Sequence, residues 1–337
     1  MNFISSGKRS PLTLAIVATL LASVLPVARA ATQDNLEKTF PATPGGKLIL
    51  DVDRGSIEVV GGDGSEVKVE VFRKVSARTE SKEKEILREH QVDFQQDGNT
   101  VTVRARGQKN SDKLWNLNRT RFDFRYVVSV PQKFNVDLKT SGGGISAEDL
   151  IGDVKVRTSG GGLKLSKIQG PITGHTSGGG ITLANCKGAI KVETSGGGIG
   201  INNGEGTLSA ETSGGSIQIK QFKGDAAVKT SGGGITSEQI EGNLEAFTSG
   251  GSISASLASQ PSGDCHLETS GGNITVRLSD NTALDIKAST NGGRVNSDLP
   301  VTVVGEKKHS SLRGKLNGGG KSLVLQTSGG NINLRKL

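Results

Sequence analysis

Three ionisable side chains recur at a fixed spacing and could do chemistry together. His175, Glu193 and Glu211 lie 18 residues apart from one another along the chain. A histidine beside two carboxylates could act as a general acid and base, or it could hold a cation weakly. Arg157 and Lys229 stand at the same spacing before and after these three residues. A solvent-exposed strip of mixed charge therefore accounts for the pattern too. We favour the strip, and we keep the three residues as weak candidates for a binding site.

These residues belong to a repeat whose signature is Thr-Ser-Gly-Gly. A fixed period of this size predicts a stack of equal units. The steps are 18 residues long from Thr140 to Thr248, and the next two are 21. The motif begins at Thr140, Thr158, Thr176, Thr194, Thr212, Thr230, Thr248, Thr269 and Thr327, and the close variant Thr-Asn-Gly-Gly begins at Thr290.

One unit predicts two short strands and two turns. Counting from the threonine as position 0, apolar residues stand at +5 and often at +7, and again at +14 and +16. Alternation of this kind is typical of a strand with one buried face. The glycines at +2 and +3, and another at +12, predict tight turns with positive φ. A further apolar residue at +10 is out of step with +5 and +7, and a corner in the chain would explain it.

The sequence therefore predicts an all-β fold, a single-stranded β-solenoid of about 18 residues per coil. The general crossover rule favours right-handed coiling. The threonines should point inward as a ladder of hydroxyls, and position +17, which holds His175, Glu193 and Glu211, should face solvent. An antiparallel meander with Ser-Gly-Gly hairpins is the alternative. We favour the solenoid because residues in one column are so alike from unit to unit.

The chain divides into three parts. Residues 1–30 have a charged start, an apolar core and an Ala-Arg-Ala site, as a secretory signal peptide does. Residues 31–139 form a β-rich N-terminal section that should cap the stack. This section contains a degenerate first unit at 51–59 and a charged surface helix at 79–90. Residues 140–337 form the regular solenoid.

Charge and composition limit the partners. The signal peptide holds three basic residues and no acid, so its removal lowers the net charge from +8 to +5. The remaining charges are interspersed, which argues against nucleic acid as a partner. Aromatic residues make up only 3% of the chain, which argues against a surface built to stack on sugars or bases. We expect an exported protein, periplasmic or at the cell surface, with no transmembrane span in the mature chain.

Neither a metal site nor a cofactor site is indicated. Four scattered histidines and two distant cysteines do not match a zinc pattern, and the glycine turns lack the ending of a phosphate-binding loop. Cys186 and Cys265 lie about four coils apart, which places them roughly 20 Å apart along the stack. A disulfide tolerates only about 7 Å between Cα atoms. We therefore expect free thiols, with Cys186 buried in the +10 column.

The serial Thr-Ser-Gly-Gly-Gly-Ile units, together with Gly55-Ser56-Ile57 and the signal peptide, resemble the bacterial "putative adhesin" β-strand-repeat family, a domain of unknown function. The resemblance covers roughly residues 45–335. It implies a β-strand repeat fold and a role at the cell surface. The family offers no catalytic residues that could be carried over to this chain.

Two functions remain open at this stage. The first is a non-enzymatic envelope or surface protein, an adhesin-like binding or scaffold module whose partner is an envelope polysaccharide or a surface protein. The second is a β-helix enzyme that degrades polysaccharide as a lyase or hydrolase. An enzyme of this kind needs a groove with high walls, whereas the short turns of these units build none. We favour the first.

Overall fold

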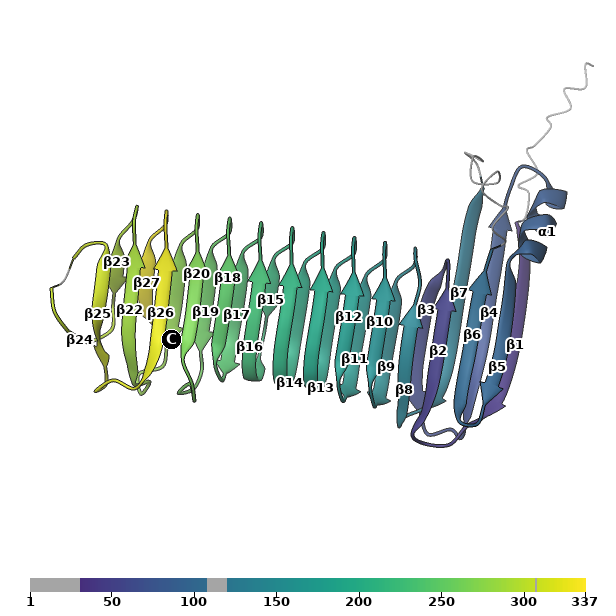
Figure 1. Cartoon of the computed structure of the whole chain (residues 1–337), viewed down its shortest axis with the longest axis horizontal. Coiled ribbons are helices and arrows are strands. Elements are labelled where there is room, and N and C mark those ends of the chain that lie inside the picture. The colour runs from purple at the N-terminus through teal and green to yellow at the C-terminus, as the bar shows by residue number, and fades with distance from the viewer. Residues whose placement is uncertain (1–30, 108–119, 307) are drawn as a thin grey trace, which may run out of the picture. The chain divides into compact units, whose positions relative to one another are not determined.

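The computed structural model describes residues 31–107, 120–306 and 308–337. The predicted signal peptide lies outside these residues. Each coil of the repeat contributes one strand to each of two parallel sheets, so that residue i pairs with residue i + 18 (Figure 1). The longest pairing joins Ile181–Thr194 to Ile199–Thr212 in parallel. The β-solenoid prediction is confirmed, and the antiparallel meander is wrong for the repeats.

Sheet 1 contains the strands that lead into the Thr-Ser-Gly-Gly turns. Its order along the stack is β5 (Gln91–Asp97), β6 (Thr100–Arg106), β2 (Gly46–Val52), β8 (Phe134–Lys139), β10 (Val154–Thr158), β12 (Ile172–Thr176), the second halves of β13 (Ile181–Thr194) and β14 (Ile199–Thr212), β16 (Phe222–Thr230), β18 (Leu244–Thr248), β20 (Cys265–Thr269), β26 (Lys321–Thr327), β22 (Leu284–Thr290), β25 (Ser311–Leu316) and β24 (Val301–Val303).

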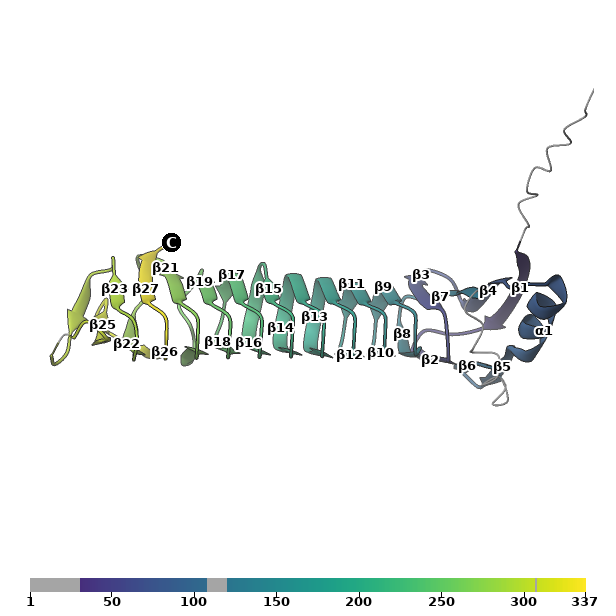
Figure 2. The same ribbon diagram turned by 90° about the horizontal axis from the view of Figure 1, so that it is seen from above.

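Sheet 2 contains the strands that leave those turns. Its order is β1 (Thr32–Pro41), β4 (Glu66–Ser76), β7 (Arg121–Pro131), β3 (Ser56–Gly62), β9 (Ile145–Ile151), β11 (Leu163–Gln169), the first halves of β13 and β14, β15 (Ile217–Ile219), β17 (Ile235–Glu241), β19 (Ile253–Leu257), β21 (Ile274–Leu278), β27 (Ile332–Lys336) and β23 (Val295–Ser297). Figure 2 shows the two sheets from above, facing each other along the stack.

The core lies between the two sheets. Residues at +5, +7, +10, +14 and +16 are buried there in the six regular coils that begin at Thr140 to Thr230. The residue at +9 has a positive φ of 50–58° in six successive coils, although none of the six is glycine. This left-handed residue places two consecutive side chains, +8 and +9, on the outside. It is the corner that the sequence predicted, and it returns +10 to the core.

The threonine at position 0 is buried and links each coil to the one before it. Thr194 is 1% exposed, its hydroxyl donates to the carbonyl of Gly179 at 2.7 Å, and it accepts the N–H of Gly197 at 3.4 Å. The same donor bond recurs from Thr140 to Thr327 at 2.7–2.9 Å. The predicted hydroxyl ladder is confirmed, with carbonyls as its acceptors.

Thr194→Val should lower the free energy of unfolding by about 1–3 kcal/mol, because the valine fills the same space but leaves the partly buried Gly179 carbonyl and the Gly197 N–H without the hydroxyl that they bond. Urea unfolding followed by circular dichroism measures this change. Ser195→Ala is the matched control, since Ser195 is exposed in the same turn and its loss should change stability by less than about 0.5 kcal/mol. Equal effects of the two substitutions would show that the hydroxyl ladder contributes nothing.

The glycines at +2 and +3 have no positive φ, so the sequence prediction is wrong at both positions and holds only at +12. The glycine at +3 is required by close approach instead. A Cβ built on Gly197 would lie 2.2 Å from the carbonyl oxygen of Gly179. At +12 both reasons apply, because Gly206 has φ +120° and its Cβ would lie 2.2 Å from the carbonyl oxygen of Gly188.

The order of coils differs from the order in sequence at both ends. The coil of β2 and β3 lies between that of β6 and β7 and that of β8 and β9. The coil of β26 and β27 likewise lies between that of β20 and β21 and that of β22 and β23. In Figure 1 the yellow β26 accordingly stands between greener strands. At each end, therefore, these early and late coils have neighbours on both sides.

Both ends finish with antiparallel strands. At the first end β4 pairs with β7 and β1 with β4, while α1 (Glu80–Glu89) packs against β4 and β1. At the other end β25 and β24 pair antiparallel beyond β22. The helix begins after Thr79, whose side chain accepts the N–H of Lys82. It is not only a charged surface element, because Glu83 is 2% exposed and accepts bonds from the Thr32 hydroxyl at 2.6 Å and the Ala77 N–H at 2.9 Å.

Both cysteines are free, as predicted, and Cys186 is buried, as predicted; Cys265 is buried too. The Cys186 sulfur lies in the +10 column, 3.5 Å from the carbonyl oxygen of Ala184. Burial raises the pKa of both thiols above the ordinary value. The protonated thiols therefore contribute stability that is complete below the unfolded-state pKa and is lost as the pH rises through the higher folded-state pKa.

A thiol reagent should accordingly react slowly with the folded protein at pH 8 and rapidly in urea, because only the exposed thiolate is a good nucleophile. Release of a coloured thiol from an aromatic disulfide reagent measures the two rates. Cys186→Ser and Cys265→Ser assign the signal to each residue. A fast phase in the native protein that disappears in one variant would contradict the burial of that cysteine.

Candidate functional site

The candidate residues lie on the outer face of sheet 1. Arg157, His175, Glu193, Glu211 and Lys229 pair as neighbours on successive strands, so the structure brings the three predicted residues together. The Nδ1 atom of His175 lies 3.6 Å from Oε2 of Glu193. The two side chains are 38% and 57% exposed, so they lie on an open strip and not in a cleft.

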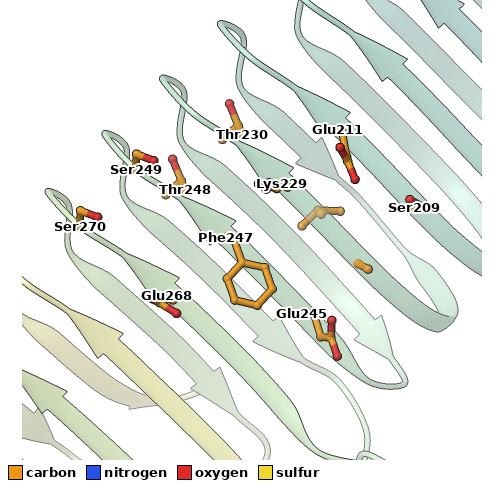
Figure 3. A pocket seen from close by; sticks show the side chains of 12 residues that line it. Ser209, Glu211, Lys229, Thr230, Glu245, Phe247, Thr248, Ser249, Glu268 and Ser270 are labelled. Atoms are coloured by element: carbon orange, nitrogen blue, oxygen red, sulfur yellow. The ribbon is translucent and has the colours of Figure 1, made fainter.

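A groove opens further along the same column, where sequence reasoning indicated no site. The next two column positions are Phe247 and Glu268, on β18 and β20. Figure 3 shows the Phe247 ring on the outer face, with Glu245 and Glu268 beside it and Ser209, Glu211 and Lys229 on the preceding strands. The groove has a volume of about 520 Å³, and we name it the Phe247 groove. Of the three predicted residues, only Glu211 lines it.

Side-chain size explains why the groove forms here. Position +15, two residues before the column, holds Lys155 and Lys191 in two earlier coils but Ser209 and Ala227 in the coils beside the groove. The small side chains leave a depression in the outer face of sheet 1, and the larger side chains of Phe247 and Glu245 lie beside it. Such a change from large to small residues along one column can be read from the sequence once the period is known.

The Phe247 ring is held from one side by a histidine. The centroid of the His266 ring lies 5.0 Å from that of Phe247, at an interplanar angle of 82°. Nε2 of His266 lies 3.5 Å from Oε2 of Glu268. An edge-to-face pair of this kind fixes the orientation of both rings. Phe247 is therefore a positioned, half-buried aromatic surface in a polar face.

The outer face of sheet 2 provides a contrast. Its +11 column reads Lys187, Glu205, Lys223 and Glu241, so the charges alternate along the stack. Nζ of Lys187 lies 2.9 Å from Oε2 of Glu205, and this ion pair holds the pKa of Glu205 below its usual value. The groove on that face is thus lined by charges that neutralise one another.

A second polar cluster lies inside the N-terminal section. Nε2 of His90 lies 3.3 Å from Oδ1 of Asp53, and the N–H of Gly107 donates to the other oxygen at 2.7 Å. Burial would raise the pKa of Asp53, but the bonds from His90 and Gly107 outweigh it and lower the pKa. His90 is 4% exposed and packs on Phe124, so the cluster fastens strands together.

In the part of the chain that the structure describes, no three histidine, cysteine or carboxylate side chains come close enough to hold a metal ion. Over the same residues, no helix has the length and apolar character needed to cross a membrane.

The model of one protein family matches residues 46–335, from β2 through β27. The chain belongs to the Toastrack DUF4097 family. The resemblance predicted from the Thr-Ser-Gly-Gly-Gly-Ile units is therefore confirmed. The Toastrack match includes the strands of the irregular N-terminal section from β2 onward, as well as the regular repeat. None of the curated proteins matches the chain.

The solved structures that match this Toastrack protein share little of its sequence. A "putative adhesin" of Parabacteroides merdae has 12% identity and a TM-score of 0.41, with 90% of this chain and 96% of that chain covered. A "putative adhesin" of Bacteroides fragilis has 12% identity and a TM-score of 0.34, covering 89% and 97%. A "putative lipid binding protein" of Parabacteroides distasonis has 12% identity and a TM-score of 0.33, covering 89% and 96%.

Proposed function

We propose that this protein is an exported, non-enzymatic module of the cell envelope that binds a polysaccharide through the outer face of sheet 1. The Phe247 groove is the observation that carries the proposal, because it places an aromatic ring among charged and hydroxyl side chains on an otherwise regular face. Export is supported by the signal-peptide pattern of residues 1–30.

The geometry of the turns supports binding over catalysis. In a regular coil only residues 152–153 separate β9 from β10, and only residues 159–162 separate β10 from β11. Turns this short raise no walls around the candidate acids. A polysaccharide-cleaving site needs two carboxyl groups held on either side of the scissile bond, in a cleft that surrounds the sugar chain. His175 and Glu193 lie open to solvent instead.

An array of envelope polysaccharides, incubated with purified residues 31–337, tests this proposal. We expect at least one polysaccharide to be retained without the appearance of new reducing or unsaturated ends. Glu205→Gln, on the opposite face, serves as the control and should bind as the unaltered protein does. Retention of none would overturn the proposed function. Released ends that vanish in Glu193→Gln or Glu211→Gln would replace binding with catalysis.

A further inference from the structure

The Phe247 groove carries an excess of negative charge. Three carboxylates line it, from Glu211, Glu245 and Glu268, against the single ammonium of Lys229. The sheet 2 groove is lined by two lysines and two glutamates and has no such excess. The full chain is basic, at +8, so the groove has the opposite sign to the molecule around it. A ligand that complements the groove is therefore cationic.

The aromatic ring favours the same ligand. A cation above the face of an aromatic ring is attracted by the negative face of its π-system. Neighbouring strands in the sheet lie about 4.8 Å apart, so Glu268 on the adjacent strand is within reach of a cation placed over Phe247. The Phe247 ring and the Glu268 carboxylate, on adjacent strands, therefore form a binding site for an ammonium group. Glu245 lies on the same strand as the ring and adds a second carboxylate.

The backbone beneath the groove excludes recognition of a peptide by strand addition. β18 pairs with β16 on one side and with β20 on the other. Strand addition needs an unpaired sheet edge, and this face offers none. Only side chains can bind here, and Ser209 and Lys229 provide donors for hydroxyl groups.

We propose that the Phe247 groove binds a segment of polysaccharide made of amino sugars with free ammonium groups. The ammonium group of one sugar lies over the Phe247 ring and faces Glu245 and Glu268, and the hydroxyls of the segment face Ser209 and Lys229. This inference rests on the proposed function and specifies the ligand class of the same site.

The test compares three probes on residues 31–337 by isothermal titration calorimetry: a glucosamine hexamer, its fully N-acetylated counterpart and hexalysine. We expect the glucosamine hexamer to bind most tightly. Phe247→Ala should weaken it about five-fold, as for a lost cation–π contact. Glu245→Gln with Glu268→Gln should weaken it about ten-fold, and so should a rise to 1 M salt, where the Debye length is about 3 Å. Glu241→Gln, on the sheet 2 face of the same repeat unit, is the matched control.

Each contrary outcome has a distinct meaning. Equal binding of the acetylated and free hexamers would overturn the proposed ammonium-binding site but would leave polysaccharide binding in place. Hexalysine bound as tightly as the glucosamine hexamer, with no effect of Phe247→Ala, would replace the amino sugar with a general cation surface. Failure of all three probes, together with a blank polysaccharide array, would overturn the proposed function as well. Circular dichroism of each variant confirms that the fold is intact.

Discussion

Gly197→Ala is expected to lower the free energy of unfolding by about 3 kcal/mol or more, because overpacking at this position cannot be relieved by a side chain. The new methyl group would lie 2.2 Å from the carbonyl oxygen of Gly179 and 2.4 Å from its carbonyl carbon. Both atoms belong to the backbone of the preceding coil, so the coils themselves must move apart. Each coil contacts only its neighbours, so a loss of contact between two coils divides the stack into two parts that no longer unfold as one cooperative unit.

Urea unfolding measures this change through the midpoint and the slope m. We expect the midpoint to fall and m to decrease, since the two halves of the stack then unfold separately. Gly198→Ser is the matched control in the same turn, because position +4 already holds serine at Ser216 and Ser252. Gly200→Ala is the second control, since a Cβ there meets no atom within 4 Å. A loss in Gly197→Ala no larger than in these two would contradict the close-approach explanation.

The regular coils could be predicted from the sequence because each position of the repeat holds the same kind of residue in the same structural role from unit to unit. An apolar residue at +5 and a threonine at 0 recur in successive units, so the inward faces, the hydroxyl ladder and the neighbouring places of His175 and Glu193 followed from the period alone. The reason for the +3 glycine did not follow. Glycine permits both a positive φ and a close approach, and only the position of the neighbouring carbonyl distinguishes the two.

The order of coils at the ends could not be predicted. Thr327 donates to Gly272 and Thr290 donates to Gly330, so the last coil in the sequence stands before its predecessor in the stack. Every unit carries the same ladder motif and can stack on any other, and the motif therefore does not encode order. The Phe247 groove was missed for a related reason. It arises where residues depart from the consensus of their columns, whereas the period reveals only what the residues of a column share.

Phe222→Ala is expected to lower the free energy of unfolding by about 3–5 kcal/mol, the usual result of removing a buried aromatic ring. Phe222 is 1% exposed in the +10 column. Its neighbour in the preceding coil is Gly204, and a Cβ there would lie 2.6 Å from Cδ2 of the Phe222 ring. The ring therefore occupies the space that a side chain at 204 would fill. Thermal unfolding and urea unfolding both measure the change.

Because a glycine and a phenylalanine are neighbours in this column, the stability effects of substitutions at Gly204 and Phe222 should depend on each other. Gly204→Ala alone should destabilise by about 1–3 kcal/mol, because the ring must shift within a packed core. Combined with Phe222→Leu, which leaves room for the methyl group, the loss should be smaller than the sum of the two single losses by about 0.5–3 kcal/mol. Gly204→Ala combined with Ile286→Val, a buried substitution in β22 remote from it, should instead add within about 0.5 kcal/mol. Additivity in both pairs would show that residues 204 and 222 do not interact across the two coils. The +10 column would then determine which residues are buried, but it would not determine which coil lies next to which.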